Sequence, residues 1–205
     1  MIAIIDYDAG NIRSVEKAFV SLGEDVTVTR DAEVLQKADK VVLPGVGNFG
    51  DCMQNLERFG LVPVIREIAS GGKPFLGICV GLQLLFEESE ESPGVKGLGI
   101  LKGRILRIPE RENLKIPHMG WNSIHLIRQN GSGRLFRGIP EQSYVYFVHS
   151  YYLKAADEGI VTATTEYGVT IHASVEKGNV FATQFHPEKS SDTGLAILRT
   201  FAELS

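Results

Sequence analysis

Apolar residues in the first half of the chain occur in two patterns that alternate with each other. Short continuous runs, which predict buried strands, cover residues 1–5, 25–29, 41–43 and 75–78. Stretches with apolar residues three or four positions apart, which predict helices, cover residues 12–22, 32–38 and 80–88, and another helical stretch has Pro63 in its first turn. Strands that alternate with helices are typical of a parallel sheet with helices on both faces.

The pattern changes after Gly94, where strand-like runs follow one another directly. These runs cover residues 100–108, 121–127, 144–149, 160–165, 170–175 and 180–185, and Gly, Asn and Pro separate them. Strands without intervening helices predict antiparallel additions to the sheet. Residues 192–204 return to helical spacing after serines that can cap a helix, so we expect a final helix that packs on the sheet.

The composition supports one compact domain over residues 1–205. The chain is 43% hydrophobic, which is enough for one substantial core at this length but short for two ordinary domains. The net charge of -4 and the dispersed basic residues argue against a nucleic-acid partner. The first apolar run is too short for a signal peptide or a membrane span, so we expect no membrane partner and a cytoplasmic location.

Cysteine and acidic residues give no sign of a metal site. The two cysteines, Cys52 and Cys79, are too few for a disulfide framework or a multi-cysteine zinc site, and a reducing compartment suits both. Cys52 matches no motif and is expected on a helix without chemistry. The acidic run 87–91 lacks converging ligands and is expected to be a solvated helix end.

Cys79 is the first candidate for chemistry. It lies in the sequence Gly-Ile-Cys-Val-Gly of residues 77–81, between a predicted strand and a predicted helix, which is typical of a nucleophile elbow with sulfur in place of oxygen. The glycines remove side chains that would clash in a sharp turn, and a helix N-terminus favours the thiolate. A buried core cysteine explains the pattern equally well, so a partner base has to decide.

His186 is the best candidate for that base among the five histidines, because it follows a strand-like run. Residues two apart lie on the same side of an extended chain, so Glu188 is expected to bind one nitrogen of His186 while the other faces the thiol. The carboxylate would fix the tautomer and stabilise the imidazolium. Alone, His-x-Glu is more often a surface accident, but with the elbow a Cys79–His186–Glu188 triad is the better explanation.

Acyl transfer also needs hydrogen-bond donors for an oxyanion. The sequence Pro-Gly-Val-Gly of residues 44–47 ends another apolar run, and its backbone amides are little covered by side chains. We predict that the N–H of Val46 or Gly47, together with that of Val80, forms an oxyanion hole. A structural turn is the alternative interpretation of this segment.

Together these motifs resemble the class I, triad-type glutamine amidotransferases, in which an elbow cysteine and a His-x-Glu pair hydrolyse glutamine. Ordered matches over the whole chain narrow the resemblance to the glutaminase subunits of imidazole glycerol phosphate synthases from histidine biosynthesis. The matching segments are residues 6–11 (DYDAGN), 43–47 (LPGVG), 77–83 (GICVGLQ), 117–122 (PHMGWN), 147–152 (FVHSYY) and 184–190 (QFHPEKS).

The resemblance implies a flavodoxin-like domain with a central, mostly parallel sheet, helices on both faces and antiparallel additions in the C-terminal half. It implies that glutamine is hydrolysed to glutamate and ammonia, and that the ammonia passes to a (β/α)8-barrel cyclase subunit. Such a barrel needs about 250 residues, so this chain cannot contain it. A heterodimer with the cyclase is therefore implied.

The resemblance also implies residue roles. The residues implied to hold the substrate glutamine are Gly47, Gln83, His149, Ser150 and Tyr151. The residues implied at the cyclase interface are Asn11, Trp121 and Lys189. Without the family, Gln83 would be an exposed helix residue, Trp121 a core residue and Lys189 a solvated charge.

The resulting hypothesis is attack of the Cys79 thiolate on the side-chain amide of glutamine, with His186 as the acid and base and with no metal or organic cofactor. We expect weak activity until a switch near residues 44–47 completes the oxyanion hole. The alternatives are the glutaminase of pyridoxal phosphate synthesis, which usually has a Gly-Gly-Glu-Ser-type loop at this point, a cysteine hydrolase of similar topology, and a non-catalytic binding module.

Overall fold

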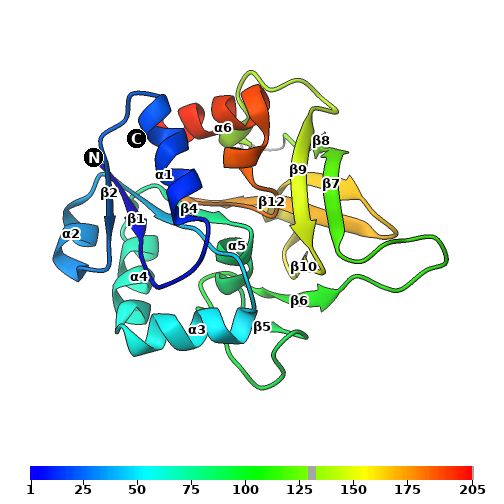
Figure 1. The fold of residues 1–205 in the computed structure, drawn as a ribbon, viewed down its shortest axis with the longest axis horizontal. Coiled ribbons are helices and arrows are strands. Elements are labelled where there is room, and N and C mark those ends of the chain that lie inside the picture. Colours follow the sequence, from blue (N-terminus) through cyan, green and yellow to red (C-terminus); the bar gives the residue numbers. More distant parts are fainter. Residues whose placement is uncertain (129–132, 205) are drawn as a thin grey trace.

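A computed structural model of the chain describes residues 1–128 and 133–204. Residues 129–132 and 205, which belong to the predicted domain 1–205, lie outside the described part of the chain. A large sheet crosses the molecule, and helices cover both of its faces (Figure 1).

The large sheet has eight strands in the order β2-β1-β3-β4-β13-β12-β11-β8. The strands from β2 to β13 in this order run parallel, and β12, β11 and β8 are added antiparallel. Their bounds are β1 Ile2–Ile5, β2 Val26–Thr29, β3 Lys40–Leu43, β4 Phe75–Ile78, β8 His125–Leu126, β11 Val161–Glu166, β12 Thr170–Lys177 and β13 Val180–Thr183. The mostly parallel sheet with antiparallel additions agrees with the sequence prediction.

Two smaller sheets lie beside it. One has the order β10-β6-β5, with β5 Glu88–Ser89, β6 Gly103–Arg107 and β10 Tyr151–Ala155. The other is an antiparallel ribbon of β7 His118–Ser123 and β9 Tyr144–His149.

The helices divide between the two faces of the large sheet. Helices α1 Ile12–Ser21 and α6 Ser191–Glu203 lie on one face, and α3 Phe49–Arg58, α4 Leu61–Ser70 and α5 Val80–Leu84 lie on the other (Figure 1). Helix α2 Ala32–Lys37 contacts α4. The described part of the chain also contains three short 3₁₀ helices: η1 Arg134–Phe136, η2 Glu158–Ile160 and η3 Pro187–Lys189.

Local sequence explains where several elements begin. Asp31 accepts hydrogen bonds from the backbone N–H groups of Glu33 and Val34 at 2.8 and 3.3 Å, so it caps α2. Asn48 caps α3 in the same way. Every residue of β1, β4 and β13 is buried, because helices cover both faces of the sheet at these strands.

Pro63 lies in the first turn of α4, as predicted, and Gly60 at a φ of 66° separates α4 from α3. The structure corrects two other sequence predictions. The helix predicted over 80–88 ends at Leu84, because the carbonyl of Leu84 accepts from Leu98 N–H at 2.8 Å instead of continuing the helix. The predicted strand 121–127 is split into β7 and β8, and β10 was not predicted.

Candidate active site

Three candidate segments leave the ends of three neighbouring strands. In the large sheet β3 pairs with β4, and β4 pairs with β13, all in parallel. Parallel strands end at the same edge of a sheet, so the loops that follow them meet there. Residues 44–47 follow β3, Cys79 follows β4, and His186 lies just beyond β13. The strand order therefore brings together motifs that lie far apart in the sequence.

Cys79 has a backbone conformation that is strained for a residue with a side chain. Its φ is 53° and its ψ is -108° where β4 passes directly into α5. A Cβ at Gly81 would lie 1.9 Å from the Leu43 carbonyl oxygen, and a Cβ at Gly77 would lie 2.8 Å from the Gly81 carbonyl oxygen. The turn therefore requires both glycines of the Gly-x-Cys-x-Gly pattern. The thiol of Cys79 is free and buried.

His186 and Glu188 are in contact, but through a backbone that differs from the sequence prediction. Nδ1–H of His186 donates to Oε1 of Glu188 at 2.7 Å, and both side chains are fully buried. Glu188 lies in the 3₁₀ helix η3, so the expected extended chain is wrong. Ser190 Oγ donates to the His186 carbonyl oxygen at 2.6 Å and stabilises this turn.

The neighbours of His186 determine its charge. Burial lowers the pKa of His186, but Cys79 and Glu188 beside it outweigh burial and raise the pKa to about 10. Among the described residues, neither Nε2 of His186 nor Oε2 of Glu188 has a hydrogen-bond partner, although both atoms are buried. The arrangement favours an imidazolium that can share its Nε2 proton with the sulfur.

Asn11 lies against the same pair of residues. It occupies the N-cap position of α1 in a left-handed conformation with a φ of 72°, and its Nδ2 donates to Oε1 of Glu188. The resemblance placed Asn11 at a protein interface, and nothing in the sequence indicated this contact. Oε1 of Glu188 thus accepts two hydrogen bonds, one from His186 and one from Asn11.

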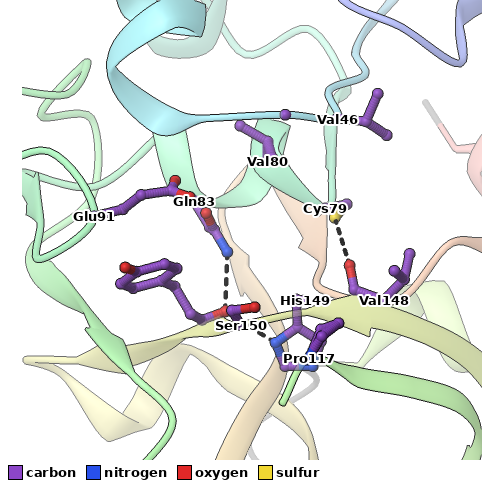
Figure 2. Close-up of a pocket in the computed structure, with 11 residues that line it drawn as sticks. Val46, Cys79, Val80, Gln83, Glu91, Pro117, Val148, His149 and Ser150 are labelled. Carbon is purple, nitrogen blue, oxygen red and sulfur yellow. Dashed lines mark hydrogen bonds between the residues drawn. The ribbon is translucent and has the colours of Figure 1, made fainter.

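A cavity of ≈ 290 Å³ lies beside Cys79 (Figure 2). The predicted site residues that line it are Val46, Gly47, Cys79, Val80, Gln83, His149, Ser150 and Tyr151. Three more lining residues were not predicted: Glu91, Pro117 and Val148. A cavity of this size suits a ligand of amino-acid dimensions better than a peptide chain.

Gln83 and Gln184 connect the cavity wall to the sulfur of Cys79. Nε2 of Gln83 donates to the Tyr151 carbonyl oxygen at 3.1 Å and to Oε1 of Gln184 at 3.2 Å. Nε2 of Gln184 in turn donates to Sγ of Cys79 at 3.8 Å. Both glutamine side chains are buried, so the interpretation of Gln83 as an exposed helix residue is wrong. Gln184 begins the matching segment 184–190, but no site role was predicted for it.

The predicted oxyanion donors border the same cavity as Cys79, but one of them already donates a hydrogen bond within the protein. The N–H of Val80 donates to the Gly45 carbonyl oxygen at 3.3 Å. The Val46 carbonyl oxygen accepts from Sγ of Cys52 at 3.8 Å, and Gly47 has a φ of 108° that favours glycine. In this structure Val80 therefore holds the loop 44–47 through a hydrogen bond that an oxyanion would have to replace.

His149 lines the cavity, yet both of its ring nitrogens have partners within the protein. Nδ1 is 2.9 Å from the Tyr151 carbonyl oxygen, and Nε2 is 3.0 Å from Nδ1 of His118. The imidazole of His149 therefore has no free nitrogen for a ligand. Figure 2 shows the ring turned toward the chain at Ser150 rather than into open space.

Glu91 corrects the expectation that residues 87–91 form a solvated helix end. It lines the cavity, and one of its carboxylate oxygens accepts from Phe49 N–H at 2.8 Å. Burial raises the pKa of Glu91. The prediction was wrong because α5 ends early and the chain then turns back beside the loop that follows β3.

Trp121 and Lys189 lie on the outside of the molecule. Trp121 is 53% exposed and its ring meets Tyr146 edge to face, so the interpretation of Trp121 as a core residue is wrong. Met119 and Tyr144 are also exposed on the ribbon of β7 and β9. Lys189 is exposed at the end of η3.

Cys52 is the other cysteine of the chain. Cys52 lies on α3 as expected, and burial raises the pKa of its thiol to about 11. Within residues 1–128 and 133–204, no group of three or more His, Cys, Asp or Glu side chains is arranged to hold a metal ion. None of the helices in the described part of the chain combines the length and the apolar character of a membrane span.

Comparisons with known proteins identify similar chains along the whole sequence. The family model for glutamine amidotransferase class-I matches residues 3–204. Imidazole glycerol phosphate synthase subunit HisH of Moorella thermoacetica is 53% identical, over 99% of this chain and 94% of that protein. The HisH subunit of Methanocaldococcus jannaschii is 51% identical over 100% of both chains.

A solved structure confirms the fold expected from the resemblance. A crystal structure of glutamine amidotransferase superimposes with a TM-score of 0.75 at 19% identity, and the match covers 98% of this chain and 100% of that one.

Proposed function

This chain belongs to the class-I glutamine amidotransferase family, and we propose that it is the glutaminase subunit of an imidazole glycerol phosphate synthase in histidine biosynthesis. The observation that carries the proposal is the free thiol of Cys79 at a strained turn, next to a buried His186–Glu188 pair and a cavity of amino-acid size. On this proposal the chain hydrolyses glutamine to glutamate and ammonia.

The first chemical step uses the charge state that the site favours. The thiolate of Cys79 attacks the side-chain carbonyl carbon of glutamine and forms a carbon–sulfur bond. His186 carries a proton on Nε2, since its pKa is raised to about 10, and gives it to the amide nitrogen as the carbon–nitrogen bond breaks. Ammonia leaves, and a glutamyl thioester remains on Cys79.

The second step releases glutamate. His186, now neutral, takes a proton from a water molecule that attacks the thioester. The carbon–sulfur bond breaks, and the thiolate and the imidazolium are restored. Glu188 keeps the His186 ring in one orientation through the 2.7 Å hydrogen bond to Nδ1 and stabilises its positive charge. Neither step calls for a metal or an organic cofactor.

The cavity walls suggest how free glutamine is held. Glu91 is the carboxylate among the lining residues, so we assign it the α-ammonium group of glutamine. Gln83 uses both of its N–H bonds inside the protein, which leaves Oε1 as an acceptor for the substrate. Gly47, Ser150 and Tyr151 complete the walls, and a site with these polar groups selects an amino acid over an apolar ligand.

Oxyanion stabilisation requires a change at residues 44–47. The bond from Val80 N–H to the Gly45 carbonyl oxygen must open before Val80 can donate to an oxyanion together with Val46 or Gly47. We assign this change to the arrival of the partner subunit with its acceptor, which couples glutamine hydrolysis to the use of ammonia.

The proposed partner is a cyclase subunit built as a (β/α)8 barrel. Its docking surface on this chain is the ribbon of β7 and β9, where Met119, Trp121 and Tyr144 are exposed. The ribbon adjoins the triad, because His186 N–H donates to the Tyr146 carbonyl oxygen at 3.0 Å. Asn11 donates to Glu188, and Lys189 follows Glu188 in η3, so both residues lie beside the triad, where we propose that ammonia passes to the partner. We assign the complex to the cytoplasm, where Cys79 stays reduced.

Ammonia release from glutamine tests the proposal. The chain is mixed with its cognate cyclase and acceptor ligand, and the rate is compared for wild type and Cys79→Ala, with and without cyclase. We expect a rate that the loaded cyclase stimulates and that the variant lacks. Stimulation by a different synthase, release of peptides, or an unchanged rate in the variant would overturn the proposal in favour of one of its alternatives.

A further inference from the structure

A hydrogen-bond network of polar side chains adjoins the cavity and takes no part in the two chemical steps. Asn122 Nδ2 lies 3.3 Å from Nε2 of His118, and Nδ1 of His118 lies 3.0 Å from Nε2 of His149. Nδ1 of His149 lies 2.9 Å from the Tyr151 carbonyl oxygen. These hydrogen bonds thus form a network that leads from strand β7 of the ribbon to the wall of the cavity.

The donor and the acceptor of every hydrogen bond in this network follow from the groups at its two ends. A carbonyl oxygen only accepts, so Nδ1 of His149 carries a hydrogen and donates to Tyr151. In a neutral ring Nε2 of His149 must then accept, so Nδ1 of His118 donates to it. Nε2 of His118 is left to accept from Asn122. Both histidines therefore have the tautomer with hydrogen on Nδ1.

At the outer end of the network, backbone groups determine the orientation of the Asn122 side-chain amide independently of the histidines. Its Nδ2 also donates to the Glu166 carbonyl oxygen at 3.0 Å, and its Oδ1 accepts from Ser123 N–H at 2.9 Å. These backbone partners determine which end of the amide faces His118. The donors and acceptors deduced from the Tyr151 end agree with those deduced from the Asn122 end, so the whole hydrogen-bond network is consistent.

The surroundings keep both rings neutral. His118 stacks between the rings of Tyr167 and Phe147, at centroid distances of 3.9 and 4.7 Å. Burial lowers the pKa of His118 to about 4 and that of His149 to about 3. The hydrogen-bond network requires each histidine ring to be neutral, with one nitrogen as donor and the other as acceptor.

At its inner end, the hydrogen-bond network shares the Tyr151 carbonyl oxygen with a residue that lines the cavity. The Tyr151 carbonyl oxygen accepts from His149 and also from Nε2 of Gln83 at 3.1 Å (Figure 2). Gln83 continues through Gln184 to the sulfur of Cys79. The orientation of the Gln83 amide therefore depends on a carbonyl that His149 holds in place.

We propose that His118 is a positioning residue for glutamine: it holds His149 in the Nδ1–H tautomer, and His149 fixes the Tyr151 carbonyl and the Gln83 amide toward the substrate. His118 does not touch the substrate or the reacting atoms. The inference rests on the proposed glutaminase function for its kinetic consequence, whereas the tautomer of His149 is a property of the folded chain alone.

The tautomer can be measured directly. Protein labelled with ¹⁵N at histidine is studied by NMR at neutral pH, and the His149 signals are assigned with a His149→Gln variant. We expect a protonated Nδ1 and an unprotonated Nε2 in wild type. A protonated Nε2, or two tautomers in exchange, would overturn the proposal whether or not the chain hydrolyses glutamine.

Two substitutions of His118 separate positioning from packing. His118→Phe keeps the ring stack but removes the donor, and His118→Asn loses the stack but retains an N–H near the position of Nδ1. In the complex with cyclase and acceptor, His118→Phe should raise KM for glutamine about three- to tenfold, the usual value of one hydrogen bond, with a smaller change in kcat. His118→Asn should restore most of the KM.

The opposite ranking of the two variants would show that His118 serves only in packing, and equal KM values for all three proteins would show that it has no effect on substrate. Thermal unfolding of each variant identifies any loss of folding. If neither variant folds, the His149 tautomer measured in the wild-type protein still tests the proposal. A wild-type complex without glutaminase activity would contradict the proposed function and leave the tautomer result intact.

Discussion

Asn11 donates a hydrogen bond from Nδ2 to Oε1 of Glu188, the same oxygen that accepts the Nδ1–H of His186. The cap of the first helix thus contacts the carboxylate that orients the base. Because the family resemblance implies that Asn11 lies at the cyclase interface, we infer that this contact links the partner to the proposed triad.

Asn11→Ala should lower kcat by about 10- to 100-fold, because a hydrogen bond to a buried charged group is lost. The KM for glutamine should change little, since Asn11 does not line the cavity. Steady-state kinetics of the saturated complex measure both values. An unchanged kcat with weaker cyclase binding would mean that Asn11 acts at the interface alone. Gln54→Ala is a suitable control, because it removes a side-chain amide that is exposed on α3.

Gly81→Ala should destabilise the fold strongly. The added Cβ would lie 1.9 Å from the Leu43 carbonyl oxygen, a contact that only movement of the backbone can relieve. Overpacking of this kind costs about 1–3 kcal/mol or more. Urea unfolding checks the change against Gly159→Ala, whose nearest contact is a side-chain oxygen of Asp157 at 3.0 Å. Equal stability of both variants would refute the close approach of α5 to β3.

The stability of the protein should depend on the charge of His186. A histidine whose pKa rises from 6.5 to about 10 on folding stabilises the fold fully below pH 6.5 and loses that contribution as the pH rises through 10. The advantage in unfolding free energy of wild type over His186→Asn should therefore shrink between pH 6.5 and 10. Urea titrations at several pH values measure it. A constant advantage between pH 6.5 and 10 would show that His186 is neutral in the folded state.

Trp121→Ala should weaken binding to the cyclase without disturbing Cys79. Trp121 is 53% exposed on the ribbon, and a large aromatic residue at an interface contributes about 2 kcal/mol or more, or about 30-fold in affinity. Calorimetric titration with cyclase measures the affinity. Val20→Ala is a matched control, because Val20 is 56% exposed on α1. Equal effects of the two substitutions would place the docking surface elsewhere.

Much of the fold could be predicted, because short apolar runs and helical spacing mark elements that are buried on both faces or on one. The predicted β4 and the start of α5 coincide with the structure, and so do the bounds of β9. The end of α5 could not be predicted, since the Leu84 carbonyl binds Leu98, a contact between distant residues.

The candidate site was predictable where a motif has its own local geometry. The Gly-x-Cys-x-Gly turn and the His-x-Glu pair are of this kind, although the pair meets through η3 rather than an extended chain. Glu91 carries no motif signal, and the motifs that contain Asn11 and Gln184 do not indicate their contacts with Glu188 and Cys79. Their place beside the site follows from the packing of elements, which the periodicity of the sequence does not report.

The order of strands in the large sheet also has a consequence for synthesis of the protein. Strand β13, which leads to His186, is synthesised after the other strands of the large sheet, and it fills the position between β4 and β12. An unfinished chain can form the parallel strands β1 to β4 and still lack the base and the wall of β9 and β10. On the proposed function, a chain that is truncated before β13 lacks His186 and would not release ammonia from glutamine.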